Sequence, residues 1–153
     1  MNVTTVPIEI QPQSKVQPLQ PFFKGTMPVP PGVNRSYKPG NRRHPIVSTK
    51  ELAQFKKDAA LMLADYEKTF HDWSLINAIR DSRLKVPLRM NITFYFKSLW
   101  KSDIDGGIKA VIDAVFHRLD LNDVLNVKLC IEKYADPDRP RVEVEVYCDL
   151  SSR

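Results

Sequence analysis

The chain has 153 residues, 42% hydrophobic and 27% charged, which is the length and composition of one ordinary globular domain. Its longest wholly apolar run, residues 59–64, is too short to cross a membrane, and no apolar leader follows Met1. We therefore exclude a membrane protein and expect a cytoplasmic one. Cys130 and Cys148 lie too far apart for a cysteine zinc motif, and two cysteines exclude a disulfide scaffold.

Positive charge is concentrated in the first third of the chain. The formal net charge is +5, yet residues 1–50 carry seven Lys or Arg against the single acid Glu9. We call residues 34–50 the basic segment, because they contain no acidic residue. Such a segment is typical of contact with a polyanion such as nucleic acid, but also of a solvated loop. Charge alone leaves both interpretations open.

The N-terminal half is predicted to contain an arm, a strand and a helix. Residues 1–20, rich in Pro and Gln, are expected to form an extended arm before one domain over residues 21–150. Residues 22–29 could form a strand, which Pro30-Pro31-Gly32 would end. Ser48 and Glu51 form a capping-box pattern that predicts a helix start. An apolar face over about 20 residues would follow; its members are Leu52, Phe55, Ala59, Met62, Tyr66 and Phe70.

The C-terminal half is predicted to contain three strands and a helix, after one or two helical turns in residues 71–86. Residues 88–97 alternate apolar and polar side chains, which predicts a half-buried strand. Residues 108–119 have helical spacing, and two alternating runs around 125–131 and 142–148 are expected to form a hairpin. The order favours an α+β fold, a small mixed sheet of about four strands with two main helices packed on it.

Residues 103–107, the acidic loop, are the main candidate for chemistry. Asp103 and Asp105 lie two apart and are followed by Gly106 and Gly107. Two carboxylates converging beside a bend are the oxygen ligands that Mg²⁺ prefers. The alternative is structural, because Asp105 could cap the following helix and Asp103 could favour its positive end.

Further charged residues follow at helical spacing. Lys109 and Asp113 continue from Asp105 at intervals of four, as in an ion-pair ladder along one helix flank. Alternatively, Lys109 beside a metal could stabilise charge on a phosphate. Asp120 and Asp123 add two more acids in the next turn, where alone they are ordinary turn residues.

Other types of site fit the sequence poorly. An EF-hand loop starting at Asp103 would need Gly and Glu where Ile108 and Ala114 stand. The Asp-x-Asp-Gly pattern also resembles that of haloacid-dehalogenase phosphatases, but too little chain follows for their doubly wound sheet. The three scattered histidines receive no catalytic role; they are His44, His71 and His117.

Four short motifs occur in a fixed order along the chain. They are Pro30-Pro31-Gly-Val-Asn34-Arg35-Ser-Tyr37, the helix start at 48–51, Asp103-Ile-Asp105-Gly-Gly-Ile-Lys109-Ala-Val-Ile-Asp113, and Leu121-Asn122-Asp123. In this order and spacing they resemble the RusA family of Holliday-junction resolvases, which are small dimeric endodeoxyribonucleases often encoded by phages and prophages. The resemblance covers roughly residues 21–148.

The resemblance implies a mechanism and a set of site residues. Asp103, Asp105 and Asp123 would bind Mg²⁺, or Mn²⁺ in its place, and Lys109 would stabilise the negative charge during phosphodiester hydrolysis. The basic segment would lie along branched DNA through Asn34, Arg35, Tyr37, Lys38, Arg42 and Arg43, although Tyr37 could equally be a core residue. Gly106 departs from the family pattern, which has Asn there, so support for the aspartates is in doubt.

The expected function is resolution of four-way DNA junctions in recombination and repair by a homodimer. A helix over residues 107–118 would separate Asp123 from the acidic loop by about 18 Å, so we expect either a turn that folds back or a site shared between two subunits. The alternative function is a non-catalytic nucleic-acid-binding protein that keeps this fold. Gly106 is the residue that favours this alternative.

Overall fold

The structure, a computed structural model, describes residues 19–44, 46–82 and 85–149, so the predicted arm lies almost entirely outside the described residues. Its main sheet has five strands in the order β4-β1-β7-β5-β6. β5 and β6 run parallel, and the other neighbouring pairs are antiparallel. These strands are β1 (Phe23–Met27), β4 (Phe70–His71), β5 (Leu88–Phe96), β6 (Asn126–Ala135) and β7 (Arg141–Cys148).

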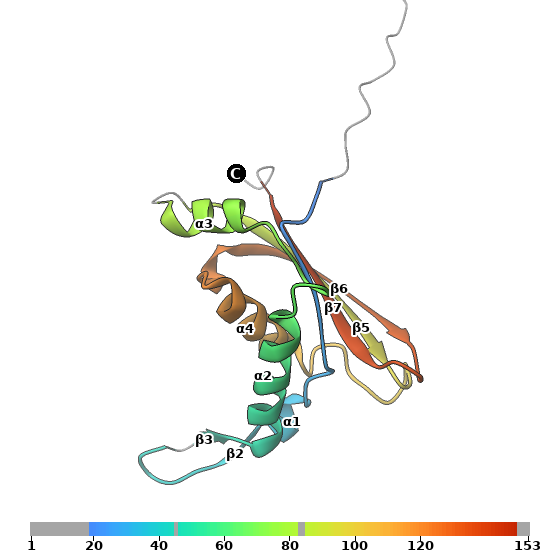
Figure 1. Cartoon of the computed structure of the whole chain (residues 1–153). Helices are drawn as coiled ribbons and strands as arrows, with labels where there is room; N and C mark the ends of the chain where they lie inside the picture. Colours follow the sequence, from blue (N-terminus) through green and yellow to red (C-terminus); the bar gives the residue numbers. More distant parts are fainter. Residues whose placement is uncertain (1–18, 45, 83–84, 150–153) are drawn as a thin grey trace, which may run out of the picture.

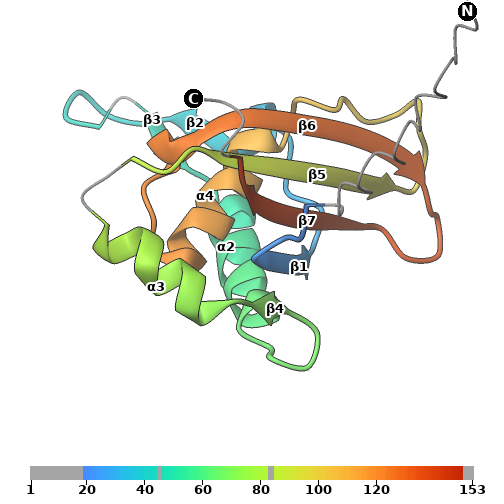
Figure 2. The ribbon, with the colours of Figure 1, turned by 90° about the horizontal axis from the view of Figure 1, so that it is seen from above.

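Three helices cover one face of this sheet (Figure 1), and the view from above shows them beneath the strands (Figure 2). They are α2 (Lys50–Leu63), α3 (Trp73–Asp81) and α4 (Ile108–Leu119). Alternate residues of β5 are buried against them, as the period-two pattern predicts. The predicted α+β class is confirmed, with one more strand in the main sheet and one more main helix than expected. No helix of the described part is long and apolar enough to span a membrane.

A small two-stranded sheet lies apart from the main sheet. A short helix α1 (Val33–Ser36) leads into β2 (Tyr37–Pro39), which pairs antiparallel with β3 (Ile46–Ser48). Figure 1 shows this hairpin extending away from the body of the molecule. Sequence periodicity could not predict it, because each strand has three residues and β2 is exposed throughout.

The helix α2 differs from its prediction at both ends. Ser48 pairs with Tyr37 in the hairpin, so Thr49 caps the helix by accepting a 3.3 Å hydrogen bond from the Leu52 amide. The predicted capping box is therefore wrong by one residue. The helix ends at Leu63 instead of continuing to Phe70, because a turn over residues 65–68 redirects the chain into β4. Tyr66 and Phe70 are consequently exposed, by 71% and 53%, rather than members of a buried face.

The predicted hairpin of the last two strands is wrong. β6 pairs with β5 on one side, whereas β7 pairs with β5 on the other and also with β1. The valines of β7 at 142, 144 and 146 are 0–1% exposed, as a central strand requires, while most residues of β6 are exposed. Alternation gives the face of each side chain but not the neighbour of each strand, which long-range packing decides.

His71 makes folding stability depend on pH. Its ring stacks on Trp73 at 4.6 Å and accepts a 3.2 Å hydrogen bond from Arg118. Burial and the Arg118 charge lower the pKa of His71 below its ordinary 6.5. Because the unfolded chain binds this proton more readily, stability should fall as the pH drops through 6.5.

We expect the urea midpoint to fall between about pH 7 and about pH 5.5, a range in which few carboxylates titrate. His71→Gln, which keeps an acceptor for Arg118, should remove most of this slope, and His117→Gln on the exposed surface of α4 should keep it. An equal slope in all three proteins would assign the pH dependence to other groups.

Candidate metal centre and nucleic-acid interface

A cavity of about 510 Å³ lies where the acidic loop meets the segment that follows β1. Asp103 and Asp105 line it together with Asn34 and Arg35 of α1. The structure thus brings two predicted metal ligands and two predicted DNA-binding residues, about 70 positions apart in the chain, to one place. The cavity is completed by Val29, Pro30, Gly32, Phe94, Phe96, Lys101, Ser102, Gly106 and Gly107.

Close packing and one lysine hold the acidic loop. A Cβ atom on Gly107 would lie 2.3 Å from Pro30 Cγ, so only glycine permits this approach of the loop to the proline segment. Lys133 of β6 donates hydrogen bonds to the carbonyls of Leu99 (2.8 Å) and Ser102 (3.1 Å). Sequence analysis missed Lys133 as a positioning residue. Its signal was a lysine in register with the core residue Phe94.

The two carboxylates of the acidic loop are available to a ligand. Asp103 and Asp105 are exposed, and neither side chain has a hydrogen bond or ion pair with the described part of the chain. The cap of α4 is Gly107, which provides no side-chain hydrogen bond. The helix-capping alternative for Asp105 is therefore wrong. Two adjacent, unpartnered carboxylates fit the oxygen preference of a hard divalent cation.

Lys109 forms part of the predicted ladder. Its ammonium lies 3.1 Å from Asp113 Oδ1, whereas no ion pair joins it to Asp105 within the described residues. The hydrogen bond to Asp113 and the charge of that carboxylate raise the pKa of Lys109, with smaller contributions from Tyr37 and Asp123. The side chain is 73% exposed. Lys109 is therefore a fixed cation that a phosphate group can reach.

Asp123 does not join the other two aspartates. It begins the short helix η1 (Asp123–Leu125), after the 12 residues of α4 have carried the chain away from the acidic loop. Within the described ranges, no three His, Cys, Asp or Glu side chains lie close enough to hold one metal ion. The predicted separation along the helix is consistent with this result, and no turn brings the three aspartates together in one chain.

The basic segment is exposed along its length. Tyr37 is 43% exposed in β2, so the core-packing alternative for this residue is wrong. The loop between β2 and β3 is shaped by Asn41, whose Oδ1 accepts hydrogen bonds from the amides of Arg43 (3.0 Å) and His44 (2.9 Å). Beside the cavity, Arg35 lies 4.0 Å from Glu51. The remaining predicted contacts, Lys38 and Arg42, are exposed on the same hairpin.

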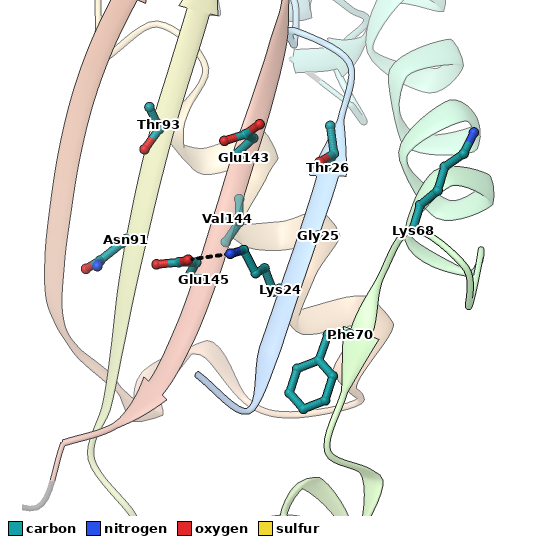
Figure 3. Close-up of a pocket in the computed structure, with 10 residues that line it drawn as sticks. All are labelled: Lys24, Gly25, Thr26, Lys68, Phe70, Asn91, Thr93, Glu143, Val144 and Glu145. Atoms are coloured by element: carbon teal, nitrogen blue, oxygen red, sulfur yellow. Dashed lines mark ion pairs between the residues drawn. The ribbon is translucent and has the colours of Figure 1, made fainter. Parts of the chain in front are cut away.

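A second pocket, of about 360 Å³, lies on the face of the sheet opposite the helices (Figure 3). Its two carboxylates are already engaged. Glu145 pairs with Lys24 at 3.2 Å and accepts a 2.5 Å hydrogen bond from Tyr147, while Glu143 pairs with Arg141 at 3.0 Å. The bond from Tyr147 lowers the pKa of Glu145, and burial raises the pKa of Tyr147 to about 12. This pocket stabilises the sheet and offers no open ligand set.

Paired open carboxylates beside a basic hairpin are typical of enzymes that cut nucleic acids. A comparison with family models identifies the particular class, since the model described as Endodeoxyribonuclease RusA matches residues 28–147. The chain belongs to the RusA endodeoxyribonuclease family, whose members resolve Holliday junctions by hydrolysing DNA phosphodiester bonds. The resemblance in the sequence is thereby confirmed. A search of curated proteins found no match.

Proposed function

We propose that this chain is a Mg²⁺-dependent nuclease that resolves four-way DNA junctions as a homodimer by paired cleavage. The observation that carries the proposal is the cavity in which Asp103 and Asp105, without partners in the described chain, lie beside Asn34 and Arg35. Residues 21–150 would form the nuclease domain, with residues 1–20 as an arm. DNA recombination and repair are the processes in which such an activity is needed.

Asp103, Asp105 and Asp123 would hold the metal, and Mn²⁺ could replace Mg²⁺ because both accept carboxylate oxygen. When bound, such an ion activates water and neutralises the leaving oxygen of a phosphodiester. Lys109 would add a positive charge next to the scissile phosphate, and its weak, exposed ion pair with Asp113 costs little to exchange.

The basic segment would position the DNA. Arg42 and Arg43, at the end of the projecting hairpin, can reach phosphates away from the cavity, while Asn34 and Arg35 lie beside the acidic loop. Tyr37, exposed between these two groups, could stack on an unpaired base. Phosphate contacts of this kind orient a duplex without reading its sequence, which suits an enzyme selective for structure.

The direct test is cleavage of a synthetic four-way junction beside a linear duplex of the same sequence, with Mg²⁺, Mn²⁺ or chelator. We expect paired nicks in the junction alone, and only with a divalent ion. A junction that is bound tightly but stays intact with both ions would favour the alternative, a DNA-binding protein without metal chemistry.

Gly106 allows a more specific test of that alternative. A Cβ atom at this position would lie 3.6 Å from Gly32 Cα and 3.7 Å from the Asp103 carbonyl, which are ordinary contacts, and no described glycine has positive φ. Gly106→Asn would place an amide beside the aspartates, as in the family pattern. Because hydrogen bonds to metal ligands change metal affinity by roughly 10–100-fold, we expect about tenfold tighter Mn²⁺ binding.

Calorimetric titration with Mn²⁺ would measure this gain. Gly106→Ala is the matched control, since it adds the same Cβ without the amide. Equal affinities of the Ala and Asn variants would show that the amide gives the aspartates no support.

A further inference from the structure

The strand β6 leaves a long open edge on the sheet. It has ten residues, it is the last strand of the order, and no strand of the described chain pairs with its outer edge. Figure 2 shows it along the border of the sheet, with β5 on its inner side. A long strand with unpaired backbone groups is a template for another strand, and proteins usually shorten, cover or charge such an edge.

Apolar side chains are exposed along this edge. Val127 is 56% exposed, Leu129 37% and Tyr134 48%. Leu129 stands in register with the core residue Met90, so it lies on the helix-covered side of the sheet and yet remains partly uncovered. Both faces of β6 thus keep surface that a neighbouring strand would bury.

We propose that a second copy of this chain pairs antiparallel with β6, centred on Cys130, and makes one continuous sheet across a two-fold axis. The charge pattern selects this register. With Cys130 at the centre, Lys128 lies opposite Glu132 of the partner subunit twice, once on each side of the axis. Opposite charges directly across an antiparallel pair stabilise it, and like charges destabilise it.

Other two-fold registers lack this match. Centring the pair on Lys128 or on Glu132 would set like charges directly opposite each other. Centring it on Leu129 or on Ile131 would leave both charges without their counterpart. In the proposed register, Leu129 lies opposite Ile131 of the partner subunit on the helix side, so apolar side chains also meet.

The pairing would also complete the metal site, a step that rests on the proposed function. β5 and β6 are parallel, and the acidic loop follows β5 near the end of β6, to which Lys133 ties it. In the proposed register, Asn126 of the partner subunit lies opposite Tyr134. The partner's Asp123, three residues earlier, then lies at the end of the sheet that carries Asp103 and Asp105. Each dimer would hold two such sites, each built from both subunits.

Disulfide trapping tests the register without DNA or metal. Residues directly opposite in an antiparallel pair have Cα atoms about 4.5–5.5 Å apart, within the range that a disulfide spans. In a Cys148→Ser background, mild oxidation should link two copies through the exposed Cys130, and Cys130→Ser should abolish the link.

Two further cysteine variants exclude random collision. With Cys130→Ser, two copies of Glu132→Cys would hold their thiols four strand positions apart, about 13 Å, and should not link. Mixing Glu132→Cys with Lys128→Cys subunits should produce a linked heterodimer. Absence of the Cys130 link, or equal linking of Glu132→Cys with itself, would overturn the proposed pairing.

Charge reversal tests the same register by affinity. Lys128→Glu and Glu132→Lys each turn both cross-strand pairs into like-charge pairs, so each should weaken the dimer roughly tenfold or more in sedimentation equilibrium. The double variant restores the match and should recover most of the affinity. A double variant as weak as the product of the two single changes would contradict the proposed contact.

Mixed subunits connect the pairing to cleavage. If the partner supplies Asp123, a heterodimer of Asp105→Asn and Asp123→Asn subunits keeps one intact site and should nick one strand, whereas each homodimer stays inactive. Linking through Cys130 without junction cleavage by the wild type would refute the proposed function and leave the pairing intact. Cleavage of junctions by the wild type, with no link through Cys130, would refute the pairing alone.

Discussion

Asp105→Asn should abolish junction cleavage while leaving the protein folded and able to bind DNA. The substitution keeps the shape of the side chain and removes the charge that a hard cation needs. Because a bound metal supplies several kcal/mol of transition-state stabilisation, we expect the single-turnover cleavage rate to fall by roughly 10³-fold or more. Quenched-flow cleavage of a labelled junction at saturating Mg²⁺ would measure the loss.

The structure also predicts what this variant should not change. The Asp105 side chain has no hydrogen bond or ion pair with the described chain and does not cap α4, so the free energy of unfolding should change by less than about 0.5 kcal/mol. Asp138→Asn, at an exposed position in the turn before β7, is the matched control and should cleave normally. Cleavage by Asp105→Asn at the wild-type rate would remove this residue from the site.

Local patterns were sufficient for the elements that have a long apolar period. The alternation of residues 88–97 predicted β5, and the spacing of residues 108–119 predicted α4 with its exact bounds. The order of the strands could not be predicted in this way. β6 and β7 both alternate, and their separation by β5 depends on the burial of the β7 valines between two neighbours.

The candidate site was predictable where residues lie close in sequence. The spacing of Asp103 and Asp105 indicated two convergent carboxylates, and the structure lines one cavity with both. The fit of Gly107 against Pro30, and the bonds from Lys133 to the loop, are long-range contacts that no sequence period reports. The position of Asp123 relative to that cavity depends on the length of a helix and on a second subunit.

Lys109→Gln should lower the rate of junction cleavage by roughly 10²–10³-fold, the effect of removing one preorganised charge from a transition state. The hydrogen bond and charge of Asp113 raise the pKa of Lys109 above its ordinary 10.5, so the ammonium stays protonated at neutral pH and cannot act as a general base. Its loss should therefore appear in kcat, with a smaller effect on the Kd for the junction. Lys109→Arg should keep part of the activity, because it keeps the charge but changes its geometry.

Lys68 offers a matched control for this substitution. Its side chain is 80% exposed, against 73% for Lys109, and it forms a comparable exposed ion pair, with Asp65 at 3.9 Å. It precedes β4, at the opposite edge of the sheet from β6. Lys68→Gln should leave the rate unchanged, since a general loss of positive charge would weaken DNA binding in both variants alike. If both variants lost the same activity through Kd alone, Lys109 would be a DNA contact rather than a charge that acts on the reacting phosphate.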